Sequence, residues 1–256
     1  MSDQVAKLAP VIWSEIQKAK HILLHCHPNP DLDSVGSVLA LKHILKKIGT
    51  SAQVISGDDP IPANTRFLPG VDQIMKSGFT EIDPKDYDLF IICDSSDPKQ
   101  ITQKTDLKLP LQIRSIVIDH HNTNVGYGDI NLVIPDQSST CEIIYNLVCR
   151  KDKQLVDLDA AQCLYAGIWS DTGGFSFAKS GDTFRTIADL IDKGVDNQLA
   201  INELSSSSTK YLKFVGYGLY ESAEHFGGQV LISKLSLKKQ QEIGLSPEKY
   251  FLFTKR

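Results

Sequence analysis

The sequence lacks a long hydrophobic segment. Its apolar runs are short, such as residues 87–93, whereas a transmembrane helix needs about 20 consecutive apolar residues. The first residues also lack the basic segment and apolar stretch of a secretory signal peptide. Both absences argue against a membrane span, so we expect a cytoplasmic protein.

Cysteines are few, and none belongs to a recognisable pair. There are five, an odd number, and no two are spaced as Cys-x-x-Cys. This pattern excludes a disulfide framework and a zinc knuckle. Cys26 and Cys93 lie in apolar, strand-like runs, where a buried thiol behaves as a small hydrophobic group. We expect all five cysteines to be structural.

An excess of positive charge is missing as well. The chain has 27 Lys and Arg against 31 Asp and Glu, a net charge of −4. No global basic field would therefore attract a long duplex DNA. What the chain does have is 41% apolar residues in 256, enough for a core in one large domain, or one domain and part of another.

Short apolar runs alternate with helical segments. We predict strands at residues 21–26, 52–56, 87–93, 113–118 and 130–134. Helices are predicted at residues 3–20, interrupted by Pro10, at 34–48, capped by Ser34, from Ser139 onward, and at 157–168, 182–193, 196–204 and 209–225. Such alternation indicates a doubly wound α/β fold: a mainly parallel five-stranded sheet with helices on both faces and a helical C-terminal portion.

Acidic residues and histidines follow three of the predicted strands. They are His27, Asp31 and Asp33 after the first strand, Asp94 after the third, and Asp119, His120 and His121 after the fourth. Ligands of open α/β sheets bind outside the carboxyl ends of the strands, so these groups should share one edge. Asp171 forms a fourth group, at the end of a predicted helix and before two glycines that allow close backbone approach.

These groups supply carboxylates and imidazoles but no thiolate. Such donors suit Mn²⁺ or Mg²⁺, and Fe²⁺ or Co²⁺ less often. Pro28 and Pro30 keep their segment extended, which holds Asp31 and Asp33 on one side while His27 reaches back. Carboxylates so close together would repel one another without cations. The sequence therefore predicts two metals about 3.5–4 Å apart, the arrangement that serves phosphoryl displacement.

Each group also has a simpler interpretation. Asp31 could be an acid at a helix start and Asp33 a helix cap. Asp94 and Asp171 could begin turns, and the pair at 120–121 could be exposed. That all four groups have only such structural roles is less favoured than that they form one shared site.

Three other places leave two interpretations open. His25 either packs in the core or supports His27. Asp97 either caps a surface helix or contacts substrate or metal. Residues 138–140 either cap a helix or present backbone N–H groups to a phosphate.

In chain order, these residues resemble the four motifs of the DHH phosphoesterase family: His27-Pro-Asn-Pro-Asp31-Leu-Asp33, then Asp94, then Asp119-His120-His121, then Asp171-Thr-Gly173. The likeness covers residues 20–200. The family includes RecJ-type exonucleases, nanoRNA and phosphoadenosine-phosphate phosphatases, cyclic-dinucleotide phosphodiesterases, exopolyphosphatases and family II pyrophosphatases. The resemblance implies an Mn²⁺-dependent phosphoesterase that hydrolyses phosphodiester or phosphomonoester bonds of small nucleotide substrates through a metal-bridging hydroxide.

The resemblance also assigns metal ligands. One metal would be held by His27 and Asp31, the other by Asp33, His120 and Asp171, with Asp94 as the bridge. The implied cofactors are two divalent cations, with Mn²⁺ first and Mg²⁺ or Co²⁺ as alternatives.

Two further residues receive roles in catalysis. His121 would face the scissile phosphate, bind it and donate a proton or hydrogen bond to it. Asp119 would orient a histidine and fix its tautomer. Two rival functions remain: a polyphosphate or pyrophosphate hydrolase, and a module that binds metal and nucleotide without turnover.

The resemblance divides the chain into a catalytic domain at 1–205 and, at 206–256, a connecting helix and the start of an incomplete second domain. The family's companion substrate domain carries a Gly-Gly-Gly-His signature that this sequence lacks. Leu32 stands where many related sequences have Gly, which should not affect metal binding. Expected partners are a short oligonucleotide, a dinucleotide or polyphosphate, with no membrane, and a homodimer is left open.

Overall fold

A computed structural model describes residues 3–107, 111–205 and 209–244. The chain forms two compact units, Met1–Leu204 and Ser205–Arg256. Among the described residues, no helix combines the length and the apolar character needed to cross a bilayer.

The first unit is built on a five-stranded sheet in which every neighbouring pair of strands is parallel. The strands are β1 (His21–His25), β2 (Ser51–Ile55), β3 (Leu89–Cys93), β4 (Ser115–Asp119) and β5 (Ile130–Val133). Their order is β2-β1-β3-β4-β5, so the chain changes direction across the sheet between β1 and β3. This confirms the predicted α/β fold and places a topological switch point between these two strands.

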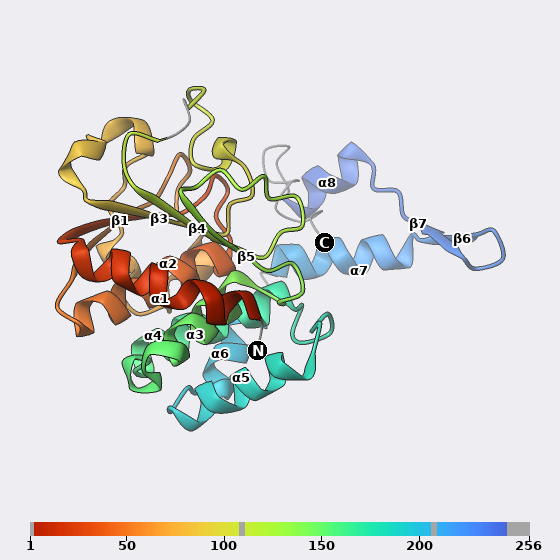
Figure 1. The fold of residues 1–256 in the computed structure, drawn as a ribbon. Coiled ribbons are helices and arrows are strands. Elements are labelled where there is room, and N and C mark those ends of the chain that lie inside the picture. The colour runs from red at the N-terminus through yellow and green to blue at the C-terminus, as the bar shows by residue number, and fades with distance from the viewer. Residues whose placement is uncertain (1–2, 108–110, 206–208, 245–256) are drawn as a thin grey trace. The chain divides into compact units, whose positions relative to one another are not determined.

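One face of the sheet is covered by α-helices (Figure 1). The helices of this unit are α1 (Asp3–Lys18), α2 (Leu32–Lys47), α3 (Thr140–Lys151), α4 (Leu158–Asp171), α5 (Gly181–Asp192) and α6 (Asn197–Ser205). Alternate strand residues such as Leu24, Ile91 and Ile116 belong to the same buried cluster as the apolar sides of α1 to α5. The larger core of the molecule lies on this face.

The other face of the sheet is covered by 3-10 helices and loops. Leu23, Phe90 and Val117 point to this side and pack with Phe79 and Ile101 from the connecting segments. Prolines recur in these segments, and they stop α-helices from forming. The helices on this face are 3-10 helices: η1 (Ala63–Thr65), η2 (Val71–Gln73), η3 (Phe79–Glu81), η4 (Pro84–Asp86) and η5 (Pro98–Gln100). A sixth, η6 (Lys153–Leu155), follows α3.

Two helix predictions near the N-terminus are wrong in detail. The first helix is not interrupted, because α1 continues through the exposed Pro10. Burial of one apolar side of α1 offsets the hydrogen bond that proline removes. The second helix begins at Leu32 instead of Ser34. Its cap is Asp31, whose Oδ1 accepts hydrogen bonds from the backbone N–H groups of Asp33 and Ser34, at 3.0 Å each.

The helix predicted at 209–225 is also too long. In the second unit, α7 (Thr209–Tyr220) ends five residues earlier, and β6 (Ala223–His225) pairs antiparallel with β7 (Val230–Ile232). Phe226, Gly227 and Gly228 all have positive φ, the left-handed conformation that forms tight hairpin turns. The unit ends, within the described residues, in α8 (Leu237–Ile243).

Two glycines allow α2 and α4 to pack closely. A Cβ atom on Gly36 would lie 2.5 Å from the carbonyl oxygen of Cys163 on α4. A Cβ atom on Gly167 would lie 2.3 Å from Cys141 Sγ and 2.8 Å from Asp33 Oδ1. Any larger residue would separate these helices, so the two glycines bring Asp33 on α2 close to α3 and α4.

Candidate metal centre

The segment after β1 places two side chains at the carboxyl edge of the sheet. The Nδ1–H of His27 donates to the carbonyl oxygen of Pro28 at 2.8 Å, because a carbonyl can only accept. This leaves Nε2 as the nitrogen that can bind a cation once it has lost its proton. That atom lies 3.3 Å from Asp94 Oδ2 and 3.8 Å from Asp31 Oδ1.

Asp94 occupies a strained backbone conformation directly after β3. Its φ is +56°, the left-handed region that Asp and Asn tolerate better than most residues and that still costs free energy. The side chain is almost fully buried, and its two oxygens face different histidines. Oδ2 faces His27, as described, whereas Oδ1 lies 3.6 Å from His120 Nε2.

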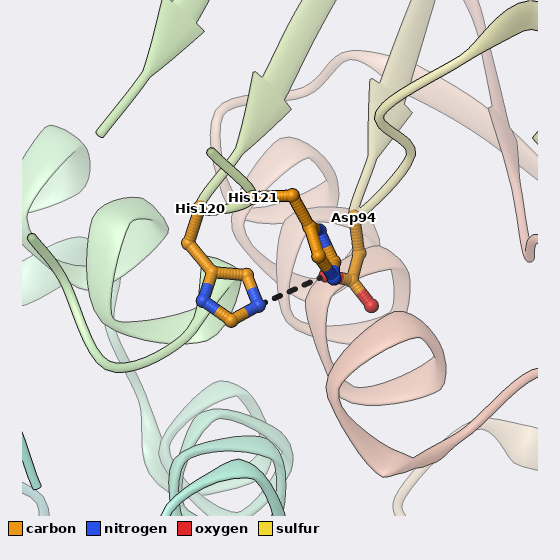
Figure 2. A group of neighbouring side chains, drawn as sticks. All are labelled: Asp94, His120 and His121. Atoms are coloured by element: carbon orange, nitrogen blue, oxygen red, sulfur yellow. Dashed lines mark ion pairs between the residues drawn. The ribbon is translucent and has the colours of Figure 1, made fainter. Parts of the chain in front are cut away.

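The two histidines after β4 converge on Asp94 (Figure 2). Their rings are 4.5 Å apart between centroids. His120 Nε2 also lies 3.0 Å from Asp171 Oδ2, at the end of α4, and 4.0 Å from Asp33 Oδ2. Both ring nitrogens of His120 are buried, and among the described residues neither makes a hydrogen bond of good geometry, the close approach of Nε2 to Asp171 included. Buried polar atoms are normally satisfied, so this imidazole is suited to a ligand that the protein itself does not supply.

Asp33 is buried under the start of α3. Its Oδ2 accepts a hydrogen bond from the backbone N–H of Thr140 at 2.7 Å, and its Oδ1 accepts one from the N–H of Cys141 at 3.0 Å. The first N–H groups of a helix have no partner within the helix and favour a negative charge. Asp33 is therefore held by α3 and is not the cap of its own helix.

Together the predicted ligands form two overlapping clusters. His27, Asp31 and Asp94 make one, and Asp33, His120 and Asp171 make another; within each, the candidate ligand atoms all lie within 4.8 Å of one another. Asp94 also clusters with His120 and His121, so it borders both groups. These are the two sets of residues that the sequence predicts, and the donor types suit a hard divalent cation.

Proton affinities in this site reflect the crowding of charges. Burial raises the pKa of Asp33 well above its usual range, and the nearby carboxylates of Asp94 and Asp171 raise it further. Burial likewise raises the pKa of Asp171. Burial lowers the pKa of His27, but the carboxylates of Asp31 and Asp94 outweigh it and raise the value to about 11. The carboxylates of this site repel one another and therefore favour bound protons, and bound cations would relieve the same repulsion.

Asp119 orients His121, as the sequence predicts for one of the histidines. Asp119 is fully buried, and its Oδ1 accepts from the Nδ1–H of His121 at 2.7 Å. This bond raises the pKa of His121 to about 9. This bond engages Nδ1 and not Nε2, and the His121 side chain is 41% exposed.

Sequence reasoning missed Asn124. Its Nδ2 donates to Asp119 Oδ2 at 2.7 Å and to the carbonyl oxygen of Ser95 at 3.2 Å. The side chain thereby ties the loop after β4 to the loop after β3. Its position three residues after His121 was visible in the sequence, but a lone Asn in a loop gives no signal of its partners.

The three open interpretations now have answers. His25 packs against Phe90, and its Nε2–H donates to the carbonyl oxygen of Gln100 at 3.1 Å, so it is a core residue. Asp97 caps η5 by accepting from the N–H of Lys99 at 2.7 Å. At residues 138–140, Ser139 caps α3, and Asp33 and the side chain of Glu142 take the N–H groups of Thr140 and Ser138, which favours the cap interpretation.

A cavity of about 800 Å³ lies beyond the carboxyl end of β2. Its lining residues belong to the segment from Ser56 to Glu81, with Lys104, and include none of the predicted site residues. Lys104 is already paired there with Glu81 at 3.0 Å and Asp58 at 3.8 Å. A hydrogen bond from the Asn29 N–H to Asp59 Oδ2 at 2.9 Å joins the wall of this cavity to the segment that carries His27 and Asp31.

Clusters of carboxylates and imidazoles at the switch point of an α/β sheet are typical of proteins that bind divalent cations. Comparison with known proteins names the family: residues 21–168 match the DHH family, N-terminal domain. The matched region exceeds half of the chain, and the chain belongs to this family.

Two relatives agree with this assignment, and one solved structure shares the fold. The chain is 30% identical to the bifunctional oligoribonuclease and PAP phosphatase NrnA of Thermus thermophilus, over 87% of this chain and 66% of the relative. It is 29% identical to the Bacillus subtilis protein of the same name, over 85% and 68%. The chain thus spans about two thirds of the length of these relatives. An exopolyphosphatase-related protein from Bacteroides fragilis has the same fold, with a TM-score of 0.86 and 24% identity over 94% of this chain and 73% of its own.

Proposed function

We propose that this chain is the catalytic part of a two-metal phosphoesterase that hydrolyses phosphodiester or phosphomonoester bonds in small nucleotide substrates. The observation that carries this proposal is the position of Asp94. Its two carboxylate oxygens face His27 and His120, which belong to different ligand clusters. A shared carboxylate of this kind is suited to two neighbouring cations.

The roles of the ligands follow from the two clusters. His27 and Asp31 would hold one cation, Asp33, His120 and Asp171 the other, and Asp94 both. When bound, the two metals would activate a water molecule and neutralise charge on the phosphoryl group. Mn²⁺ is our first choice because the donors are carboxylate oxygens and imidazole nitrogens, with Mg²⁺ or Co²⁺ as alternatives.

His121 is the residue best placed to act on the substrate. Asp119 takes its Nδ1–H, so at neutral pH a ring with a pKa of about 9 carries a second proton on Nε2. That proton can be donated to a phosphate oxygen or to the leaving oxygen. Asp119 fixes the tautomer and orientation of the ring, and Asn124 fixes Asp119.

The substrate class rests on the relatives and on the charge of the chain. NrnA of two bacteria is named for oligoribonuclease and PAP phosphatase activity, and a relative with 25% identity is the cyclic-di-AMP phosphodiesterase GdpP of Bacillus subtilis. All three names describe cleavage of short nucleotide substrates. The net charge of −4 agrees with a small substrate and not a long duplex.

The first experiment compares Asp94→Asn with Asp97→Asn. Asparagine tolerates the left-handed backbone at position 94, so this change removes the negative charge and keeps the fold. We expect Asp94→Asn to lose Mn²⁺ binding in calorimetry and hydrolysis of an aryl phosphate ester. Asp97→Asn alters a nearby acid that only caps η5 and should keep both. Full activity of Asp94→Asn, or of the wild type in excess chelator, would refute the two-metal proposal.

A substrate panel separates this function from its rivals. We expect Mn²⁺-stimulated hydrolysis of a dinucleotide, a short oligoribonucleotide or adenosine 3′,5′-bisphosphate. Phosphate release from polyphosphate or pyrophosphate alone would instead identify a polyphosphate hydrolase. Mn²⁺ binding without hydrolysis of any of these would identify a module without turnover. The cytoplasmic location, the homodimer and the incomplete second domain at 206–256 stay predictions.

A further inference from the structure

Thr140 is the first residue of α3 and touches two of the proposed metal ligands. Its backbone N–H donates to Asp33 Oδ2 at 2.7 Å, and its hydroxyl group donates to Asp94 Oδ1 at 3.1 Å. The residue is completely buried. One residue therefore contacts a carboxylate of the second cluster through its backbone and the shared carboxylate through its side chain.

The hydroxyl group of Thr140 restricts the rotation of the Asp94 carboxylate about its terminal torsion. Each oxygen of that carboxylate must face a different histidine if it is to be shared: Oδ1 lies 3.6 Å from His120 Nε2, and Oδ2 lies 3.3 Å from His27 Nε2. A terminal carboxylate torsion is broad and has no sharp minimum of its own. A hydrogen bond to Oδ1 fixes which oxygen faces which cluster.

Thr140 can fix that rotation because its own position is fixed. Ser139 Oγ accepts from the N–H of Glu142 at 3.1 Å, and the carboxylate of Glu142 accepts from the N–H of Ser138 at 3.0 Å. The hydroxyl group of Thr183, on α5, also donates to Glu142, at 3.0 Å. The first turn of α3 is thus held from both sides, which leaves Thr140 little freedom to move.

We propose that Thr140 is a positioning residue that sets the rotation of the Asp94 carboxylate and so shares it between the two ligand clusters. The inference rests on the proposed metal site. It goes beyond that site by assigning a role to a residue that belongs to neither ligand cluster. Hydrogen bonds to metal ligands of this kind typically contribute about 10–100-fold in metal affinity or activity.

The test compares three variants by Mn²⁺ calorimetry, kinetics and thermal unfolding. Thr140→Val keeps the shape and the backbone N–H but removes the hydroxyl group. Thr140→Ser keeps the hydroxyl group. Thr65→Val is the matched control, because Thr65 is also completely buried and its hydroxyl group donates only to a backbone carbonyl, that of Pro62, at 2.7 Å.

We expect Thr140→Val to weaken Mn²⁺ binding and to lower kcat by about 10–100-fold with little change in KM. Thr140→Ser should recover most of both. Thr65→Val should lower Tm by a similar amount and leave Mn²⁺ affinity and kcat unchanged. Wild-type affinity and kcat in Thr140→Val would overturn the role of Thr140 and leave the metal site standing. Equal losses in Thr140→Val and Thr140→Ser would also overturn it. A wild-type protein that binds no Mn²⁺ would instead refute the proposed function.

Discussion

The two ligand clusters of the candidate site are held in different ways. His27 and Asp31 lie on a loop stiffened by two prolines, and the Asp31 side chain is 52% exposed. Asp33 is completely buried, and both of its oxygens accept N–H groups from the start of α3. The first cluster thus depends on local backbone stiffness, whereas the second depends on packing among three helices. One side of the candidate site is therefore partly exposed and held by its own loop, whereas the other is buried and held by neighbouring helices.

The largest effect should come from comparing Asp33→Asn with Asp31→Asn. Asparagine at 31 still caps α2, and its amide oxygen can still coordinate a metal. Asparagine at 33 would have to point an NH₂ group at a backbone N–H. We expect Asp33→Asn to lower kcat by on the order of 10³-fold or more, since a bound metal contributes several kcal/mol to catalysis.

Asp31→Asn should lower kcat clearly less than Asp33→Asn does. It should weaken the binding of only one of the two Mn²⁺ ions. Steady-state kinetics and calorimetric stoichiometry measure both effects. Equal losses in the two variants would show that the clusters do not differ in rigidity.

A smaller effect is expected from Asn124→Ala. The change removes the hydrogen bond to Asp119 but no metal ligand, so kcat should fall by about 10–100-fold while Mn²⁺ affinity stays the same. Asn131→Ala is the control, because Asn131 also joins a loop through its side chain, to Gly128 at 2.7 Å and 3.0 Å. If Mn²⁺ affinity fell as much as kcat, Asn124 would belong to the metal site and not to the His121 side.

The smallest effect concerns protons released when metal binds. The pKa of His27 is about 11, so the ring is protonated at pH 7.5, but a metal ligand must be neutral at Nε2. Mn²⁺ binding should therefore release protons, and affinity should rise as pH rises from 6 to 9. Calorimetry in two buffers of different ionisation enthalpy measures the number released.

The variant His27→Gln sharpens this measurement. It should release about one proton fewer than the wild type, because the glutamine side chain has no proton to lose when metal binds. Identical proton release in both proteins would mean that His27 is neutral before metal binds.

Much of the fold and of the ligand set could be read from the sequence because both depend on local patterns. Apolar runs of strand length predicted the five strands, and the parallel arrangement placed the groups that follow β1, β3 and β4 at one edge. The wrong helix predictions arose where a local sequence signal disagreed with the packing. Pro10 indicated an interruption in α1 that burial overrode, and Phe226 to Gly228 form a hairpin turn where a helix was expected to end.

Strand order alone predicted that His27, Asp31, Asp33, Asp94 and His120 lie at one sheet edge, and the resemblance to the DHH family added Asp171 to them. The contacts that hold these residues in place come from the packing of distant segments. The N–H groups of α3 reach Asp33 across more than a hundred residues, Thr140 reaches Asp94, and Asn124 ties Asp119 to Ser95. Such hydrogen bonds depend on the packing of distant helices and loops, and no local pattern of residues encodes them.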